Sequence, residues 1–257
     1  MRDKINRYLT KIEEEKDMKI LLACETGSRA WGFPSPDSDY DVRIIYKHKK
    51  EWYLSLSKNK DSINLMFENN QIDIAGWDLR KTLMLLHKSN PPLLERIQSP
   101  IIYKSDNEFL KEIKTIAKGE YSRIAAIHHY LSMAKKFLEE IKGKKEYRLK
   151  KFFYALRAAT ACKWILEKEQ MPPIEFLKMV NNLNLSKSMI NRINELISLK
   201  AKVSEKYYHK GEERLIDFME DCINESDNKR EELPAAKRDI NKLNLFFLKT
   251  LNRYEHR

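Results

Sequence analysis

Two carboxylates and a guanidinium lie close together in residues 38–44, which read SDYDVRI. In an extended strand successive side chains point to opposite faces, so Asp39, Asp41 and Arg43 share one face. Neighbouring carboxylates disfavour each other's charge unless a cation lies between them. Hard divalent ions prefer oxygen ligands, and phosphoryl-transfer sites bind them through a few carboxylates plus substrate phosphates. The pattern therefore predicts a Mg²⁺ (or Mn²⁺) site at Asp39 and Asp41.

A glycine followed by a small hydroxyl residue stands upstream of these carboxylates. Gly27 lets the backbone come close to a phosphate group, and the amide N–H groups and the Ser28 hydroxyl are hydrogen-bond donors. Arg29 adds a positive charge beside them. These residues predict the nucleotide-binding side of the same site.

The Gly27-Ser28 segment and the Asp39/Asp41 segment together resemble the signature of the DNA polymerase β-type nucleotidyltransferase superfamily. The shared pattern is Gly27-Ser28, then Gly32, then SDYD at fixed spacing. The fuller string GSRAWGFPSPDSDYDVR, with GWDLRK, SNPPLLE and SPIIYKS downstream, is similar to the branch of predicted nucleotidyltransferases associated with RNA ligases. The resemblance implies a two-metal transfer of a nucleoside monophosphate from a ribonucleoside triphosphate to an acceptor hydroxyl. Together with the basic charge, it favours an RNA end, in tRNA or in RNA repair.

The superfamily requires a third carboxylate on a neighbouring strand. Ile72 and Ile74 alternate with Asp73, which puts Asp73 on the polar face of a strand at 71–77. We expect Asp73 to be the general base for the acceptor hydroxyl or a further metal ligand. Asp78 is the alternative, but it precedes the helical run LRKTLMLLHKS, where an aspartate is a typical N-cap.

Composition limits the class of protein. With 257 residues the chain is long enough for two domains. No apolar run approaches the roughly 20 residues of a membrane helix, and the charged N-terminal stretch has no secretory pattern. We therefore expect a cytoplasmic protein that does not bind membranes. The three cysteines lack metal-ligand or redox spacing, and the net charge of +11 favours anionic partners, nucleic acid first.

Strand-like runs stop near residue 106, and helical periodicity follows. The sequence therefore predicts an α+β fold: a nucleotidyltransferase domain with a mixed sheet and flanking helices at 1–118, then an all-helical domain at 119–257. A helix at 145–170 carries Lys151 and Arg157 on one flank. The resemblance implies that these two cations bind the triphosphate, and a solvated basic flank is the alternative.

The sequence leaves other readings of the function open. The acceptor hydroxyl could belong to a protein or to a small molecule instead of an RNA. A non-catalytic nucleotide or RNA sensor on the same fold is a further alternative, although the presence of Asp39, Asp41 and Asp73 argues against it. The preferred base and the oligomeric state are not defined by the sequence.

Overall fold

The computed structural model describes residues 1–57, 59–234 and 238–253. Contacts between residues divide the chain into two compact units. The first unit comprises residues 1–30, 39–121 and 237–257, and the second comprises residues 31–38 and 122–236.

The first unit contains a five-stranded sheet in the order β3-β4-β2-β1-β5. Its strands are β1 (Lys19–Glu25), β2 (Tyr40–Lys47), β3 (Ser62–Phe67), β4 (Ile72–Asp78) and β5 (Ile102–Ser105). Its helices are α1 (Arg2–Glu15), α2 (Gly27–Trp31), α3 (Lys50–Leu54), α4 (Leu79–His87), α5 (Pro91–Gln98), α6 (Asn107–Glu120) and α12 (Ile240–Asn252), of which α2 ends at the unit boundary. The predicted strands at 19–24 and 71–77 are confirmed to within one residue at either end.

The sheet is mixed. Strand β1 pairs antiparallel with both β2 and β5, and β3 pairs antiparallel with β4. Strands β2 and β4 are parallel neighbours at the centre. The predicted α+β class with a mixed sheet is therefore confirmed.

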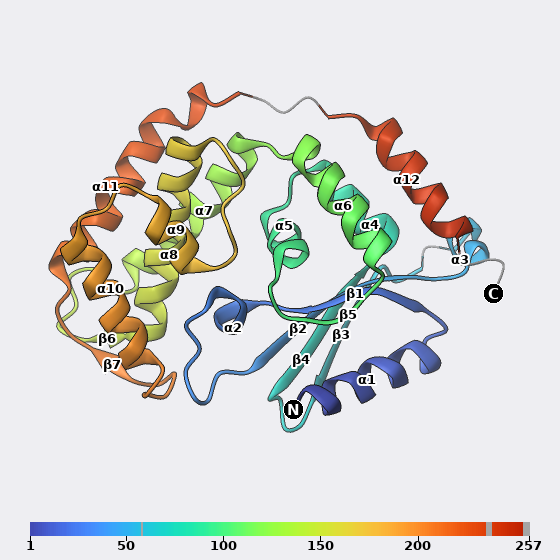
Figure 1. Cartoon of the computed structure of the whole chain (residues 1–257), viewed down its shortest axis with the longest axis horizontal. Helices are drawn as coiled ribbons and strands as arrows, with labels where there is room; N and C mark the ends of the chain where they lie inside the picture. Colours follow the sequence, from blue (N-terminus) through green and yellow to red (C-terminus); the bar gives the residue numbers. More distant parts are fainter. Residues whose placement is uncertain (58, 235–237, 254–257) are drawn as a thin grey trace. The chain divides into compact units, whose positions relative to one another are not determined.

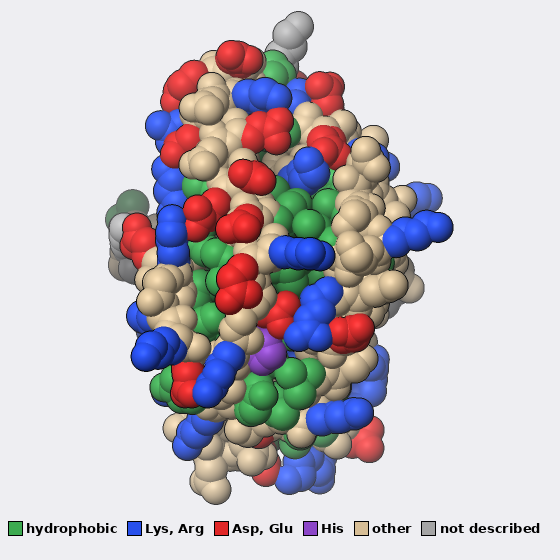
Figure 2. Space-filling view, turned by 90° about the vertical axis from the view of Figure 1, so that its left-hand side faces the viewer, with side chains coloured by type: hydrophobic (Ala, Val, Ile, Leu, Met, Phe, Trp, Pro, Cys, Tyr) green, Lys and Arg blue, Asp and Glu red, His purple; other side chains and the backbone are tan. Residues whose placement is uncertain are grey.

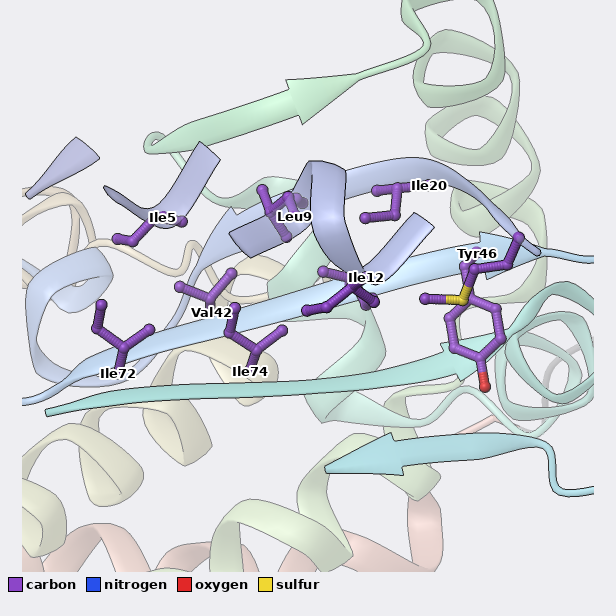
Figure 3. Close-up of a cluster of buried hydrophobic side chains, with 11 residues drawn as sticks. Ile5, Leu9, Ile12, Ile20, Val42, Tyr46, Ile72 and Ile74 are labelled. Carbon is purple, nitrogen blue, oxygen red and sulfur yellow. The ribbon is translucent and has the colours of Figure 1, made fainter. Parts of the chain in front are cut away.

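Helix α1 covers one face of this sheet, and α4, α5 and α6 lie on the other side (Figure 1). Ile5, Leu9 and Ile12 recur at helical spacing on α1 and are at most 2% exposed. They point toward Val42 and Ile74 of the sheet (Figure 3). Burying each such side chain stabilises the unit by about 1.5–3 kcal/mol. The apolar face of the central strands is thereby committed to the core, which leaves their polar face for a site.

Among its described residues, the second unit is helical apart from one short pairing of β6 with β7. Its elements are α7 (Arg123–Glu139), β6 (Tyr147–Arg148), α8 (Leu149–Lys168), α9 (Phe176–Asn182), α10 (Lys187–Lys200), β7 (Tyr208–His209), α11 (Glu213–Lys229) and a 3₁₀ turn, η1 (Arg230–Glu232). Helix α8 is buried along most of its length, and α7 and α11 both pack on it.

The division into units differs from the predicted boundary at 118/119 in two respects. Helix α12, which was expected in the helical domain, packs on α4 and α6 of the first unit. Segment 31–38, which was expected in the first domain, belongs to the second unit because Phe33 packs among aromatic side chains of α8 and α9. The predicted closing helix at 235–253 begins at Ile240, and residues 235–237 lie outside the described residues. Within the described ranges no helix is both long and apolar enough to cross a membrane.

Candidate active site

The candidate active site lies on the polar face of the parallel strands β2 and β4. Their register places Asp41 directly opposite Asp73. Because side chains alternate along a strand, both carboxylates and Arg43 point away from the core residues Val42 and Ile74. The side chains of Asp41 and Asp73 remain accessible, at 36% and 24% exposure. Two carboxylates predicted from separate parts of the sequence are therefore neighbours.

The guanidinium of Arg43 lies between these two carboxylates. Its Nη2 atom donates to Oδ1 of Asp41 at 3.0 Å and to Oδ2 of Asp73 at 2.8 Å. Its Nη1 atom donates to the backbone oxygens of Val42 at 3.1 Å and of Asp73 at 3.0 Å. Arg43 therefore offsets the repulsion between the carboxylates and holds Asp73 in place. The predicted contact of Arg43 with a nucleotide stays a prediction.

Gly27 lies against the side chain of Asp41. Its φ is +64°, a conformation that favours glycine. A Cβ atom at Gly27 would come within 2.2 Å of Oδ2 of Asp41. The backbone amide of Thr26 also donates to the backbone oxygen of Asp41, at 2.9 Å. The Gly27 segment and the Asp41 segment of the motif therefore meet, and a side chain at position 27 would have to displace the Asp41 carboxylate.

Helix α2 brings Ser28 and Arg29 to the same end of the sheet. Ser28 is 6% exposed. The Nε atom of Arg29 donates to the backbone oxygen of Asp39 at 3.1 Å, and its Cζ lies 3.8 Å from the centroid of the Tyr40 ring. Arg29 therefore ties α2 to the start of β2. Asp39 itself is exposed, directly before that strand.

Glu25 is a further acidic residue of the site that the sequence analysis missed. It is fully buried at the end of β1, accepts a hydrogen bond from the backbone amide of Asp41 at 2.7 Å, and accepts another from the hydroxyl of Tyr103. Burial raises the pKa of Glu25 to about 7, and the charge of Asp41 acts in the same direction. The signal in the sequence was a carboxylate directly after the apolar run ILLAC of this strand.

Asp78 has the structural role that the sequence predicted. It is the N-cap of α4, and its carboxylate accepts hydrogen bonds from the amides of Lys81 at 2.8 Å and Arg80 at 3.1 Å. The side chain is only 1% exposed. Its oxygens are thus committed to the helix, whereas Asp73 faces Asp41.

The residues present fit a hard divalent ion. Oδ1 of Asp73 is buried and has no hydrogen-bond partner within the described part of the chain. Among the same residues, no group of three or more His, Cys, Asp or Glu side chains forms a cation cage. Mg²⁺ does not need one, because it is usually held by one or two carboxylates plus substrate phosphates and waters. Asp41 and Asp73 supply two carboxylates, and Asp39 is exposed two residues before Asp41 in the sequence.

Lys151 and Arg157 lie on α8 of the second unit. Arg157 is 2% exposed; its Cζ lies 4.4 Å from the centroid of the Trp31 ring, and its Nη2 donates to the backbone oxygen of Ile174 at 3.3 Å. Lys151 pairs with Glu140 at 3.1 Å. Both side chains therefore have partners inside their own unit, and their binding of a triphosphate stays a prediction.

Residues 1–249 match the RNA repair pathway DNA polymerase beta family (RlaP), so the chain belongs to this family. The predicted superfamily and branch are thereby confirmed. The chain is 36% identical over 252 residues to uncharacterized protein YcgL of Bacillus subtilis (strain 168), covering 98% of this chain and 96% of that one. A crystal structure of a nucleotidyltransferase-like protein from Exiguobacterium sibiricum 255-15 aligns with 98% of this chain and 81% of its own, at 10% identity and a TM-score of 0.33.

Proposed function

We propose that this protein is a metal-dependent nucleotidyltransferase that moves a nucleoside monophosphate from a ribonucleoside triphosphate to a hydroxyl group at an RNA end. The observation that carries the proposal is the placement of Asp41 opposite Asp73 on accessible strand faces, with Gly27 against Asp41. Membership of an RNA repair family of DNA polymerase β type supports the same reaction class.

Asp39, Asp41 and Asp73 are the residues that would hold Mg²⁺ or Mn²⁺. When bound, the ion supplies positive charge that offsets the charge of the triphosphate. The backbone at Gly27 lies against the Asp41 carboxylate, and Ser28 follows it on α2. In this mechanism the backbone at Gly27 and the Ser28 hydroxyl donate to phosphate oxygens.

The transfer itself is an in-line displacement at the α-phosphorus. The acceptor oxygen forms a bond to this phosphorus while its proton passes to Asp73. The bond from the α-phosphorus to its bridging oxygen breaks, and pyrophosphate leaves with the electron pair. Arg29 and Arg43 offset the charge that builds on the phosphoryl oxygens, and Lys151 and Arg157 are further candidates for binding the triphosphate.

The proposal is tested by a transfer screen. The protein is incubated with each ribonucleoside triphosphate, radiolabelled at the α-phosphate, with Mg²⁺ or Mn²⁺ and with total RNA or total protein as acceptor. The double variant Asp39→Asn with Asp41→Asn is run beside it. We expect label on RNA, and we expect the double variant to lose it while keeping its fold by circular dichroism, because substitution by the amides removes the two charges and little volume.

The acceptor pool that takes the label decides among the alternatives. If the label appears on protein, the acceptor is a protein hydroxyl and not an RNA end. Binding of a triphosphate without label in either pool would favour a small-molecule acceptor or a nucleotide sensor. Transfer that persists in the double variant would refute the catalytic role of these carboxylates.

A further inference from the structure

Arg96 is a buried arginine on the side of the sheet that carries the candidate site. It lies near the end of α5 and is 7% exposed. Its Cζ atom lies 3.3 Å from the centroid of the Trp77 ring, so the flat face of the guanidinium is covered by the indole. The backbone oxygen of Arg96 accepts from the thiol of Cys24 at 3.3 Å, which ties this turn of α5 to β1.

The charge of Arg96 lacks the compensation that a buried guanidinium normally has. In the described part of the chain, its buried Nη1 atom has no hydrogen-bond partner. Leaving a buried charged donor unsatisfied is costly, and such groups are normally paired with an anion. Burial lowers the pKa of Arg96 to about 9. The carboxylate of Asp73 attracts the positive charge of Arg96, but Asp73 forms its ion pair with Arg43.

The strand register shows where this guanidinium lies relative to the carboxylates. Asp73, Ala75 and Trp77 follow one another on a single face of β4 because side chains alternate. Arg43 is paired in register with Ala75, between the other two positions. Along this face the carboxylates are therefore followed by the Arg43 guanidinium and then by the Arg96 guanidinium, stacked on Trp77.

We propose that Arg96, stacked on Trp77, is an anion subsite that binds a phosphate group of a substrate beyond Arg43, on the strand face that carries Asp41 and Asp73. The indole covers one face of the guanidinium and orients it, so the N–H groups at its edge can bind two oxygens of one phosphate. The phosphate belongs either to the ribonucleoside triphosphate or to the end of the acceptor RNA. This assignment to a substrate rests on the proposed function, whereas the anion subsite itself does not.

The subsite is tested first with inorganic phosphate at low salt, because this measurement requires no turnover. Binding is followed by tryptophan fluorescence in the wild type, in Arg96→Met and in Arg96→Lys. Arg80→Met is the matched control: Arg80 also lies over aromatic rings, those of Tyr53 and Phe247, but its guanidinium donates to the backbone oxygen of Tyr53 at 2.7 Å.

We expect saturable binding by the wild type and by Arg80→Met. We expect about tenfold to a hundredfold weaker binding by Arg96→Met, in line with the loss of a charge-assisted hydrogen bond. Arg96→Lys keeps the positive charge but not the two parallel N–H donors, so its affinity for phosphate should lie between those of the wild type and Arg96→Met. This variant keeps the test decisive if Arg96→Met does not fold. No saturable binding by the wild type, or equal affinity in all folded variants, would overturn the subsite.

The source of the phosphate is identified by binding of ATP and of an RNA oligonucleotide with or without a terminal phosphate. Selective weakening of ATP binding in Arg96→Lys assigns the subsite to the triphosphate. Selective weakening for the phosphorylated oligonucleotide assigns it to the acceptor. Unchanged affinity for all three ligands would refute a substrate role even if inorganic phosphate binds. A failed transfer screen alone would contradict the proposed function and leave these dissociation constants intact.

Discussion

At the scale of single residues, the candidate site depends on a contact between a backbone and a carboxylate. Two separate features favour glycine at position 27. Its φ is in the left-handed region, and a Cβ atom there would collide with the side chain of Asp41. Gly32 shares only the first feature: its φ is +93°, but a Cβ atom there would meet nothing within 4 Å. The two glycines therefore separate backbone strain from displacement of the carboxylate.

We predict that Gly27→Ala reduces nucleotidyl transfer by about a hundredfold, because a displacement of Asp41 by about 1 Å is enough for a loss of this size. Gly32→Ala should lose about 1 kcal/mol of stability from strain, with transfer within a few-fold of the wild type. Steady-state kinetics and urea unfolding of both variants check this. Equal transfer by the two alanine variants would contradict the role given to the Gly27 contact.

At the scale of elements, the connection between the two halves of the motif is packed inside the second unit. Within segment 31–38, Phe33 stacks on Phe153 at 4.8 Å between ring centroids. Ser35 accepts from Nζ of Lys200 at 2.9 Å, and Ser38 donates to Glu205 at 2.8 Å. The segment immediately precedes Asp39 in the sequence, and its side chains pack within the helical unit.

Lys200, which donates to Ser35 in this segment, makes the stability of the folded state depend on pH. It is 1% exposed, and burial lowers its pKa, opposed by the charges of Glu205 and Asp37 and assisted by that of Lys150. An unfolded lysine binds its proton up to a pH of about 10.4. Between the lowered pKa and this value the unfolded state binds more protons, so the stability of the folded state rises with pH. Below the lowered pKa the cost of burying the charge is fully present.

We therefore predict that wild-type stability rises relative to that of Lys200→Met as the pH is raised from neutrality toward 10. Urea unfolding of both proteins across this range measures the difference. Lys202→Met, which removes a charge from an exposed neighbour, is the control and should run parallel to the wild type. Parallel curves for Lys200→Met and the wild type would show that Lys200 does not titrate as burial requires.

At the scale of the whole molecule, the chain returns to its first unit at its end. Nζ of Lys47, 6% exposed on β2, donates to the backbone oxygens of Thr250 at 3.3 Å and Leu251 at 2.9 Å. Phe246 of α12 stacks on Phe109 of α6 at 5.6 Å between ring centroids. Helix α12 thus covers apolar side chains of the sheet unit and satisfies a buried lysine there.

We predict that a chain ending at residue 239 loses hydrogen-exchange protection in β2 and α6 to a greater extent than in α8, because the contacts of α12 described above join it to β2 and α6. Hydrogen exchange followed by mass spectrometry measures the three segments separately. Leu245→Ala, on the face of α12 where Leu245 is 69% exposed, should leave the protection unchanged. Uniform loss along the chain, or loss confined to α8, would contradict the assignment of α12.

The net charge of +11 is also a property of the whole molecule. On the face shown in Figure 2, lysine and arginine side chains are interspersed with aspartate and glutamate. Elsewhere in the described residues, cations are paired with carboxylates, as Lys142 is with Glu220 and Lys150 is with Glu205. Charge alone therefore marks no RNA-binding area on this face, and the proposed acceptor rests on the family and on the site.

The sequence by itself determined the features that have local causes. Alternation predicted that Asp39, Asp41 and Arg43 share a face; β2 contains Asp41 and Arg43, whereas Asp39 precedes it. Helical spacing predicted α1, and the position of Asp78 before an apolar run predicted its role as N-cap. Each of these signals arises from residues within one turn or strand. The family could also be recognised from the sequence, because the residues of its motif occur at fixed spacing.

Only the tertiary structure decided which distant segments meet. The register that puts Asp41 opposite Asp73, the insertion of Arg43 between them and the stacking of Arg96 on Trp77 depend on how separate strands and helices pair. The burial of Glu25 beneath the site likewise depends on strands brought together by the core. Such contacts join residues far apart in the chain, and hydrophobic packing is non-directional, so local sequence patterns do not specify the register or the partners of these contacts.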